Sequence, residues 1–471
     1  MAFNTFQFIL LFPWLFLLYY AIPQKWQQTR NLYLLVVSYS LYIQWKPVYA
    51  LVLLFVTFVT FGAAWLLGRT EKRKAITIAG CVVALSPLLA FKYFNFVNEV
   101  ISDALAWVGI DCQPVGLNWA IPVGISFFTL QAIGYLVDVY LYRVKAERDF
   151  LTYALFISFF PSILTGPINK ASLVIPQLKS LRPYFDYEKV VEGTRMLLWG
   201  MFMKVVVADR LAIYVISVLD HYDRYNGTTC FMASFFYTMQ IYADFAGYSL
   251  MAIGVGKTLG FELTENFRRP YFSVSVTDFW RRWHISLSTW LKDYIYIPLG
   301  GSRCSKARNY LNIIVTFLVS GIWHGANWTF IFWGLLHGVT QAFEKMIGQQ
   351  GCRYTGMGKF VKIFVTFVFI NFSWIFFRMP TLQDAFNVVG RIFDFSQPMG
   401  WDINGENINT LFFSAIGIAM LFAKDYIDEF TNIKIFDHHR LVVRWLAYSI
   451  VLSSILLTGV FGSDQFIYAN F

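Results

Sequence analysis

Apolar residues occur in long blocks separated by short polar segments along most of the chain. Most blocks approach the ~20 residues that a helix needs to cross the hydrocarbon core of a bilayer. The pattern therefore predicts an all-α polytopic membrane protein with about 12 transmembrane helices and no soluble domain. The blocks span residues 3–21, 32–45, 48–67, 75–94, 120–141, 196–219, 231–256, 311–323, 328–343, 363–377, 411–421 and 441–460.

The polar segments alternate in charge, and this alternation predicts the orientation of the helices. Basic clusters at 25–30, 69–74 and 143–148 are separated by the segment 95–119, which contains no Lys or Arg. Lysine and arginine collect in the cytoplasmic loops of membrane proteins. We therefore expect both chain ends outside the cytoplasm, including a short tail at 462–471. The first block has no basic segment before it and no cleavage site after it, so we expect it to be retained.

One further apolar block, residues 151–164, is expected to enter and leave the membrane on the same side. Basic residues lie on both sides of it, and it is followed by Gly166 and Pro167. Irregular backbone at membrane depth is stable only where protein or a water-filled cavity surrounds it. The pattern therefore predicts a re-entrant element.

Composition supports a multi-pass membrane protein. Of the 471 residues, 57% are hydrophobic and 14% are charged. The net charge of +10 falls in the loop clusters, so it indicates topology and not nucleic-acid binding. The five cysteines are scattered without a CxxC pair, so we expect no zinc or redox site.

A basic region between residues 257 and 308 is suited to an anionic ligand. It contains nine Lys or Arg residues and four Asp or Glu residues, which gives a net charge of +5. Membrane topology alone explains the sign of this charge, but not the aromatic segments between the charges. Arg281, Arg282 and Lys292 are therefore candidates for contacting phosphates.

Two Trp-His pairs, at His284 and His324, lie 40 residues apart in the most distinctive part of the chain. If 278–290 is one helix, three of its tryptophans fall within about a quarter-turn at 100° per residue. Asp278 and Arg282 are four apart and can pair. This segment could line a cavity at the cytoplasmic boundary, although an interfacial helix with no active role has the same pattern.

His324 is the strongest catalytic candidate from the residues themselves. A neutral imidazole is the usual general base near pH 7, and keeping one at membrane depth is costly without a role or a partner. Gly325 next to it leaves room for a substrate to approach. The alternative is a hydrogen-bonded packing histidine. His337 would point away from His324 on a continuous helix, so we expect it to have a packing role.

Several longer motifs resemble the membrane-bound O-acyltransferase family, in particular its bacterial alginate O-acetyltransferase type. One position departs from the family pattern, because Leu250 stands where that pattern has Asp. The motifs cover most of the chain in order: VGISFFTLQAIGYLVDVY from Val123, FFPSILTGPI from Phe159, QIYADFAGYSLMAIG from Gln240, FWRRWHISLSTWLKDYIYIPLGG from Phe279, and SGIWHGANWTFIFWGLLHG from Ser320.

The resemblance implies a fold and a set of roles. The fold is one transmembrane domain over 1–471 with its catalytic core at about 120–345, in which a ring of helices surrounds a central funnel or tunnel. His324 matches the family's catalytic histidine and His284 its companion. Bacterial members of this type work with a separate extracytoplasmic acetyltransferase, here expected to be of the SGNH type, which delivers the acyl group to a polysaccharide.

We therefore predict an inner-membrane O-acyltransferase that takes acetyl from cytosolic acetyl-CoA, with no bound cofactor. His324 would act as general base or as a covalent acyl carrier. His284 would orient it or stabilise the thioester oxyanion. Trp283 and Asn327 are further candidates for binding substrate. The alternative is a secondary transporter with His324 as a proton relay, but the sequence lacks the paired halves that many transporters show.

The chain ends in a short aromatic segment that contains Tyr468. It resembles an aromatic C-terminal motif, FxYFxF, of related acyltransferases or their partner subunits, with Ala469 in place of the middle Phe. The resemblance implies that Tyr468 carries the acyl group. The alternative is an aromatic anchor at the membrane interface.

Overall fold

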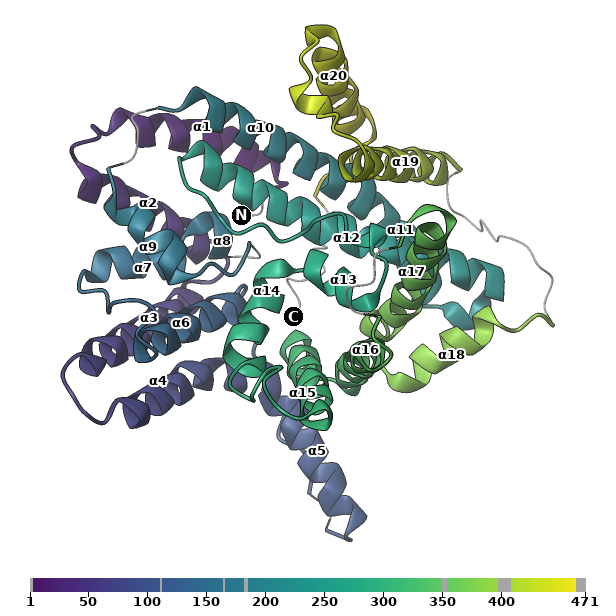
Figure 1. Cartoon of the computed structure of the whole chain (residues 1–471), viewed down its shortest axis with the longest axis horizontal. Coiled ribbons are helices and arrows are strands. Elements are labelled where there is room, and N and C mark those ends of the chain that lie inside the picture. The colour runs from purple at the N-terminus through teal and green to yellow at the C-terminus, as the bar shows by residue number, and fades with distance from the viewer. Residues whose placement is uncertain are drawn as a thin grey trace. The chain divides into compact units, whose positions relative to one another are not determined.

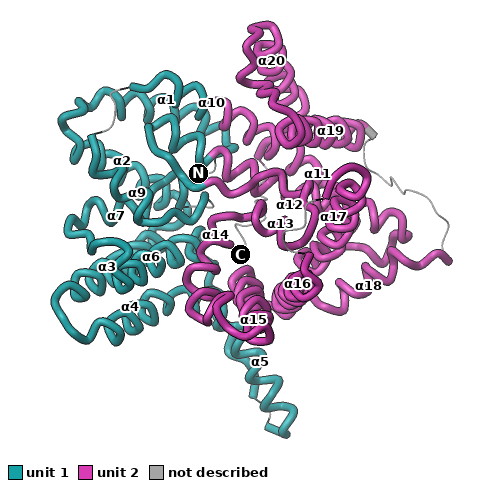
Figure 2. The backbone as a smooth tube through the Cα atoms, in the orientation of Figure 1, with its two compact units in different colours: residues 1–193, 252–264, 468–471 teal, residues 194–251, 265–467 magenta. Residues whose placement is uncertain are grey.

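The computed structural model describes residues 3–110, 112–163, 166–181, 185–349, 354–396 and 408–462, and every regular element in them is a helix (Figure 1). The described chain divides into two compact units. Unit 1 comprises residues 1–193, 252–264 and 468–471, and unit 2 comprises residues 194–251 and 265–467 (Figure 2). The all-α prediction is therefore confirmed. A single transmembrane domain over 1–471, with its core at 120–345, stays a prediction.

Unit 1 contains the N-terminal helices. They are α1 (Phe6–Ala21), α2 (Gln27–Ile43), α3 (Pro47–Leu67), α4 (Arg73–Leu88), the π-helix η1 (Leu89–Tyr93), α5 (Phe94–Trp107), α6 (Ile125–Tyr140), α7 (Phe150–Ser158), α8 (Phe160–Ile163), α9 (Ala171–Lys179) and the start of α10 (Tyr187–Met201). The block at 151–164 is interrupted at Phe159, between α7 and α8. Its re-entrant path stays a prediction, since residues 164 and 165 lie outside the described range.

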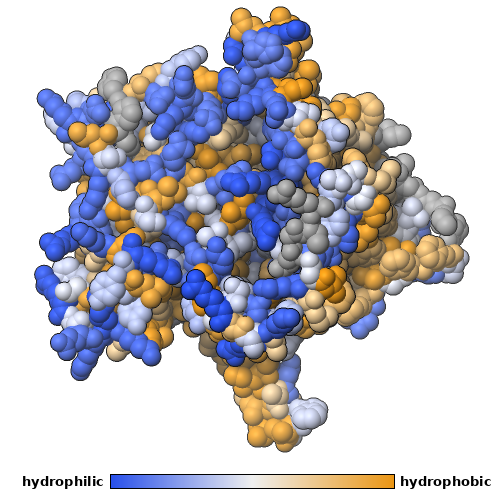
Figure 3. Space-filling model, viewed as in Figure 1, coloured by the Kyte–Doolittle hydropathy of each residue, from blue (hydrophilic) through white to orange (hydrophobic). Residues whose placement is uncertain are grey.

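The segment 95–119 was expected to be a loop between two apolar blocks, but its first part is helical. Helix continues from α4 through η1 into α5 and ends only at Trp107. The reason is local, because residues 94–107 contain no Gly or Pro to end the helix. Val97, Ile101 and Trp107 on α5 are exposed, and the surface of α5 is largely hydrophobic (Figure 3). Such a surface suits contact with lipid.

Unit 2 contains the remaining elements and all the candidate site residues that the structure describes. Its helices are the π-helix η2 (Phe202–Ala208), α11 (Asp209–Leu219), most of α12 (Gly227–Thr258), α13 (Val276–Arg282), α14 (Ile285–Leu291), the π-helix η5 (Lys292–Tyr296), α15 (Lys306–His324), α16 (Trp328–Met346), α17 (Gly356–Arg378), α18 (Leu382–Ile392), α19 (Ile408–Phe430) and α20 (Leu441–Thr458).

Five helical segments are long and apolar enough to cross a membrane: Pro47–Leu67, Arg73–Trp107, Gly356–Arg378, Asn409–Phe430 and Leu441–Thr458. Three shorter apolar segments are Phe6–Ala21, Ile125–Tyr140 and Phe150–Ile163. These helices confirm the multi-pass membrane character within the described residues. The number of 12 spans, the re-entrant helices and the ring around a funnel stay predictions.

Helices α15 and α16 form a tightly packed hairpin that holds His324 at its turn (Figure 1). Two glycines allow their backbones to approach. A methyl group at Gly334 would overlap the carbonyl oxygen of Phe317, and one at Gly321 would overlap the carbonyl oxygen of Phe330. Small residues serve this purpose in membrane helices, where van der Waals packing drives association.

We expect Gly334→Ala to destabilise the protein, because the added methyl group must push α15 away. Overpacking of this kind typically costs about 1–3 kcal/mol. The matched control is Gly390→Ala, in the last turn of α18, where an added Cβ meets nothing within 4 Å. That change should be neutral or stabilising by about 0.5–1 kcal/mol. Thermal unfolding in detergent compares the two variants, and equal midpoints would contradict this account of the hairpin.

Candidate active site

The segment 278–290 is two helices, not the single helix that was predicted. α13 ends at Arg282, Trp283 is extended, and His284 takes a left-handed conformation with φ 43° before α14 begins. Asn266 explains the break. Its carbonyl oxygen accepts from Ile285 N at 3.0 Å, and its side-chain Oδ1 accepts from Ser286 N at 3.1 Å. These tertiary bonds replace the helical bonds that would continue α13, so the predicted aromatic face does not exist as one surface.

His284 is fully buried and has a defined tautomer. Its Nδ1 lies 3.3 Å from Asn266 Oδ1. Because that oxygen already accepts from Ser286 N, it acts as an acceptor here, and His284 Nδ1 must carry the proton. Burial lowers the pKa of His284 to about 3, so the imidazole is neutral at physiological pH. Its Nε2 therefore presents a lone pair.

His324 ends α15 and lies among aromatic rings. It is 1% exposed, and its ring centroid lies 4.9 Å from that of Trp323, 5.1 Å from Trp333 and 5.2 Å from Phe377. The Trp323 ring also lies 6.0 Å from the ring of His284. The structure thus brings the two Trp-His pairs together around one indole.

The room that Gly325 was expected to leave for a substrate is filled. A side chain at Gly325 would overlap the ring of Phe330. The small residue therefore serves packing at the turn between α15 and α16. A substrate must reach His324 from another direction.

His337 has the packing role that was expected. Trp280 Nε1 donates to its Nδ1 at 3.2 Å, and its Nε2 lies 3.1 Å from Ser373 Oγ. Since Ser373 Oγ itself donates to Ile370 O, it accepts from His337. Both ring nitrogens are therefore used. The angular argument behind the expectation fails, because the helix is broken before Trp328 and both His337 and His324 contact Trp333.

A cavity of about 400 Å³ lies between α13, α14, α15 and α16. The exposed side chains of Arg281 and Lys292 line it, and so does the half-buried Lys345. Ser320 lines it from α15, one helical turn before His324. The volume is in the range of small-molecule sites. Arg281 and Lys292 were predicted from the sequence, but Lys345 was not, because it follows an apolar block and no motif surrounds it.

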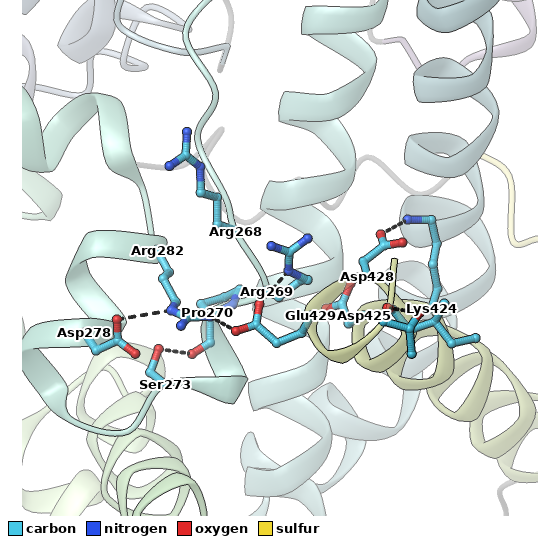
Figure 4. Close-up of polar contacts among 12 residues, drawn as sticks. Arg268, Arg269, Pro270, Ser273, Asp278, Arg282, Lys424, Asp425, Asp428 and Glu429 are labelled. Carbon is cyan, nitrogen blue, oxygen red and sulfur yellow. Dashed lines mark hydrogen bonds and ion pairs between the residues drawn. The ribbon is translucent and has the colours of Figure 1, made fainter. Parts of the chain in front are cut away.

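Arg282 is occupied in ion pairs. It lies 3.2 Å from Asp278, as its spacing predicted, and 2.8 Å from Glu429 of α19 (Figure 4). Arg269 binds the second oxygen of Glu429 at 2.8 Å. Two adjacent arginines therefore differ, since Arg281 lines the cavity and Arg282 joins α13 to α19.

The other candidates also have structural contacts or lie outside the described residues. Asn327 caps α16 by accepting from Thr329 N at 3.1 Å, and it donates to Pro380 O at 2.7 Å. Trp283 is buried against Phe279 and Trp374. Tyr468 and residues 463–471 are outside the described range. Substrate binding by Asn327 and Trp283, and acyl transfer through Tyr468, stay predictions.

Residues 143–382 match the family described as MBOAT, membrane-bound O-acyltransferase family. The chain belongs to this family. The matched region contains both histidines of the site and the whole cavity lining. The resemblance drawn from the motifs is confirmed, and the chain is an acyltransferase. This assignment leaves the transporter interpretation without support.

Curated relatives agree with the family assignment. The chain is similar to a probable alginate O-acetylase AlgI of Pseudomonas aeruginosa, with 37% identity over 89% of this chain and 80% of that protein. A protein of the same name from Pseudomonas putida is 34% identical over 100% of both chains. A peptidoglycan O-acetyltransferase of Helicobacter pylori is 35% identical over 83% of this chain and 79% of that protein.

Proposed function

We propose that this MBOAT protein takes an acetyl group from acetyl-CoA on the cytosolic side of the bacterial inner membrane and passes it outward for O-acetylation of an extracytoplasmic polysaccharide. Relatives named for alginate and peptidoglycan O-acetylation support the acyl group and the acceptor class. These relatives are named for two different acceptors, so the proposal specifies a polysaccharide and not one particular polysaccharide.

One observation carries the proposal: the same cavity is lined by cationic side chains and by a residue of α15 that lies one helical turn from His324. Arg281, Lys292 and Lys345 come from three different elements and give one part of the lining a positive charge. Ser320 lines the same cavity, one turn of α15 before His324. An anionic thioester bound by the cations would extend toward the imidazole.

The two histidines have different roles in the proposed chemistry. His324 removes the proton from the acceptor hydroxyl, the oxygen attacks the thioester carbon, the C–S bond breaks, and the leaving thiolate takes up the proton. His284 in its neutral form offers an acceptor nitrogen. An acceptor nitrogen can orient a group that donates a hydrogen bond near His324. It cannot donate a hydrogen bond to an oxyanion.

The partner and the carrier belong to the same proposal. An SGNH-type acetyltransferase outside the membrane would collect the acyl group and transfer it to the polysaccharide. A hydroxyl carrier such as Tyr468 would split one transfer across the membrane into two easier ones. Both ideas rest on the family resemblance.

We expect Arg281→Ala to raise the KM for acetyl-CoA about fivefold, because an exposed cation contributes up to about 1 kcal/mol to binding a phosphate. The penalty should shrink at high salt, which screens exposed charges. Arg282→Ala is the matched control in the adjacent residue. It should lower the thermal midpoint and change the KM little, because it breaks pairs with Asp278 and Glu429. Equal KM values for wild type and Arg281→Ala would remove Arg281 from the donor site.

A further inference from the structure

Two buried polar groups that the proposed mechanism does not use line the cavity between α13, α14, α15 and α16. Ser320 is 0% exposed and Gln341 is 8% exposed, and both line the cavity. Within the part of the chain that the structure describes, neither Ser320 Oγ nor Gln341 Nε2 has a hydrogen-bond partner. Buried polar groups in folded proteins are nearly always hydrogen-bonded, so these two atoms require an explanation.

The hydrogen bonding of the Ser320 hydroxyl differs from that of another hydroxyl on the same helix. Thr316, one turn earlier on α15, donates its hydroxyl to Asn312 O at 2.6 Å. A serine in a helix can satisfy itself in the same way. Among the described residues Ser320 Oγ has no such partner, although it lies in the same helix and lines the same cavity.

Along the two helices, Gln341 lies one turn from Lys345 and Ser320 lies one turn from His324. Gln341 precedes Lys345 on α16 by four residues, and Ser320 precedes His324 on α15 by four residues. Four residues of helix rise by roughly 6 Å and place both side chains on one face. Gln341 is thus adjacent to a cation, and Ser320 is adjacent to the proposed base.

The wall that carries Gln341 is fixed in position. Glu344, on the same helix, accepts from Val276 N at 2.7 Å and from Thr277 N at 2.9 Å. These bonds tie α16 to the start of α13, the helix that carries Arg281. A hydrogen-bonding group on a fixed wall loses little entropy when a ligand binds.

We propose that Gln341 and Ser320 are positioning residues that hydrogen-bond the amide-bearing arm of the donor thioester, an inference that rests on the proposed function. The arm of CoA consists of secondary amides that end in the thioester. Gln341 Nε2 donates to a carbonyl oxygen of the arm. Ser320 Oγ bonds the donor closer to the thioester, one helical turn from His324.

Donors of different length test this inference. Acetylpantetheine keeps the amides of acetyl-CoA but lacks its nucleotide, and ethyl thioacetate lacks the amides as well. Gln341→Met preserves the length of the side chain and removes its donor. It should raise the KM about fivefold to tenfold for acetyl-CoA and for acetylpantetheine, the loss expected for one hydrogen bond, and should leave ethyl thioacetate turnover unchanged. Arg281→Ala should affect only acetyl-CoA.

Two further variants separate binding from folding. Ser320→Ala should lower kcat/KM severalfold for both amide-bearing donors. Thr340→Val is the control, because the Thr340 hydroxyl donates to Leu336 O at 2.8 Å and Thr340 is outside the cavity lining. Without donor, the thermal midpoint of Gln341→Met should equal or exceed that of wild type, since an unpartnered buried group has been removed.

Three results would overturn the inference. One is that Gln341→Met has the same KM as wild type for both acetyl-CoA and acetylpantetheine. Another is an equal loss with ethyl thioacetate accompanied by a lower thermal midpoint, which would show a purely structural role. If wild-type protein turns over no acetyl thioester, the proposed function fails and the inference fails with it. If wild-type protein is active and Gln341→Met has the same KM values, the inference is rejected and the proposed function is not.

Discussion

We expect His324→Ala to abolish acyl transfer from acetyl-CoA and leave the protein folded in the membrane. A general base contributes about 10²–10⁴-fold to the rate, so its removal should bring turnover to background. Alanine favours helix, and His324 is the last residue of α15, so the helix should persist. Turnover by purified protein and protein abundance in the membrane measure the two effects separately.

Two more variants make this result specific. His324→Gln keeps a polar side chain of similar size but provides no base, and it should be as inactive as the alanine variant. His439→Ala, in an exposed position before α20, should behave like wild type. Near-normal turnover by His324→Ala at normal abundance would remove the central residue of the proposed mechanism.

His284→Ala should lower the rate about 10²-fold, at the lower end of the range for a base, because it removes the group that orients the reacting atoms. The neighbouring Asn266 provides a sharper test, since its Oδ1 accepts from His284 Nδ1. Asn266→Asp places a carboxylate beside the imidazole and raises the pKa of His284 from its value of about 3.

The sign of the pH effect follows from these pKa values. In wild type, His284 stays neutral above pH 4, so it should impose no acid limb on the rate between pH 5 and 8. In Asn266→Asp, protonation of His284 removes its acceptor nitrogen at low pH, and activity should recover as the pH rises. The measurement is the pH profile of kcat/KM for both proteins. Superimposable profiles would exclude His284 from the reaction.

Hydrophobic blocks predicted most of the helices because burial in lipid or protein requires them to be apolar. They could not predict where helices end when a distant residue decides it. The segment 278–290 contains no Gly or Pro, and its break depends on hydrogen bonds to Asn266. Helix α5 was missed for the opposite reason, since its polar residues resemble those of a loop although nothing in them ends a helix.

The motifs contain both histidines and part of the cavity lining, but not the part that α16 contributes. The spacing of Asp278 and Arg282 predicted one ion pair of Arg282, but not its second pair with Glu429, which is far along the chain. Gln341 and Lys345 fall at the end of an apolar block and belong to no motif that was recognised. Their significance depends on the packing of α16 against α13 and α15, which a linear pattern does not contain.

The indole of Trp323 has a consequence for how the two histidines can be studied. It contacts both imidazole rings, so the histidines share a neighbour and are not independent sites. Substitutions at sites with a shared neighbour have non-additive effects, with coupling energies of about 0.5–3 kcal/mol. The logarithmic losses of the two single variants should therefore sum to more than the loss of the double variant. A single substitution at Trp323 would change the surroundings of both histidines at once. Another residue can therefore replace Trp323 in evolution only if the packing around both imidazole rings is adjusted as well.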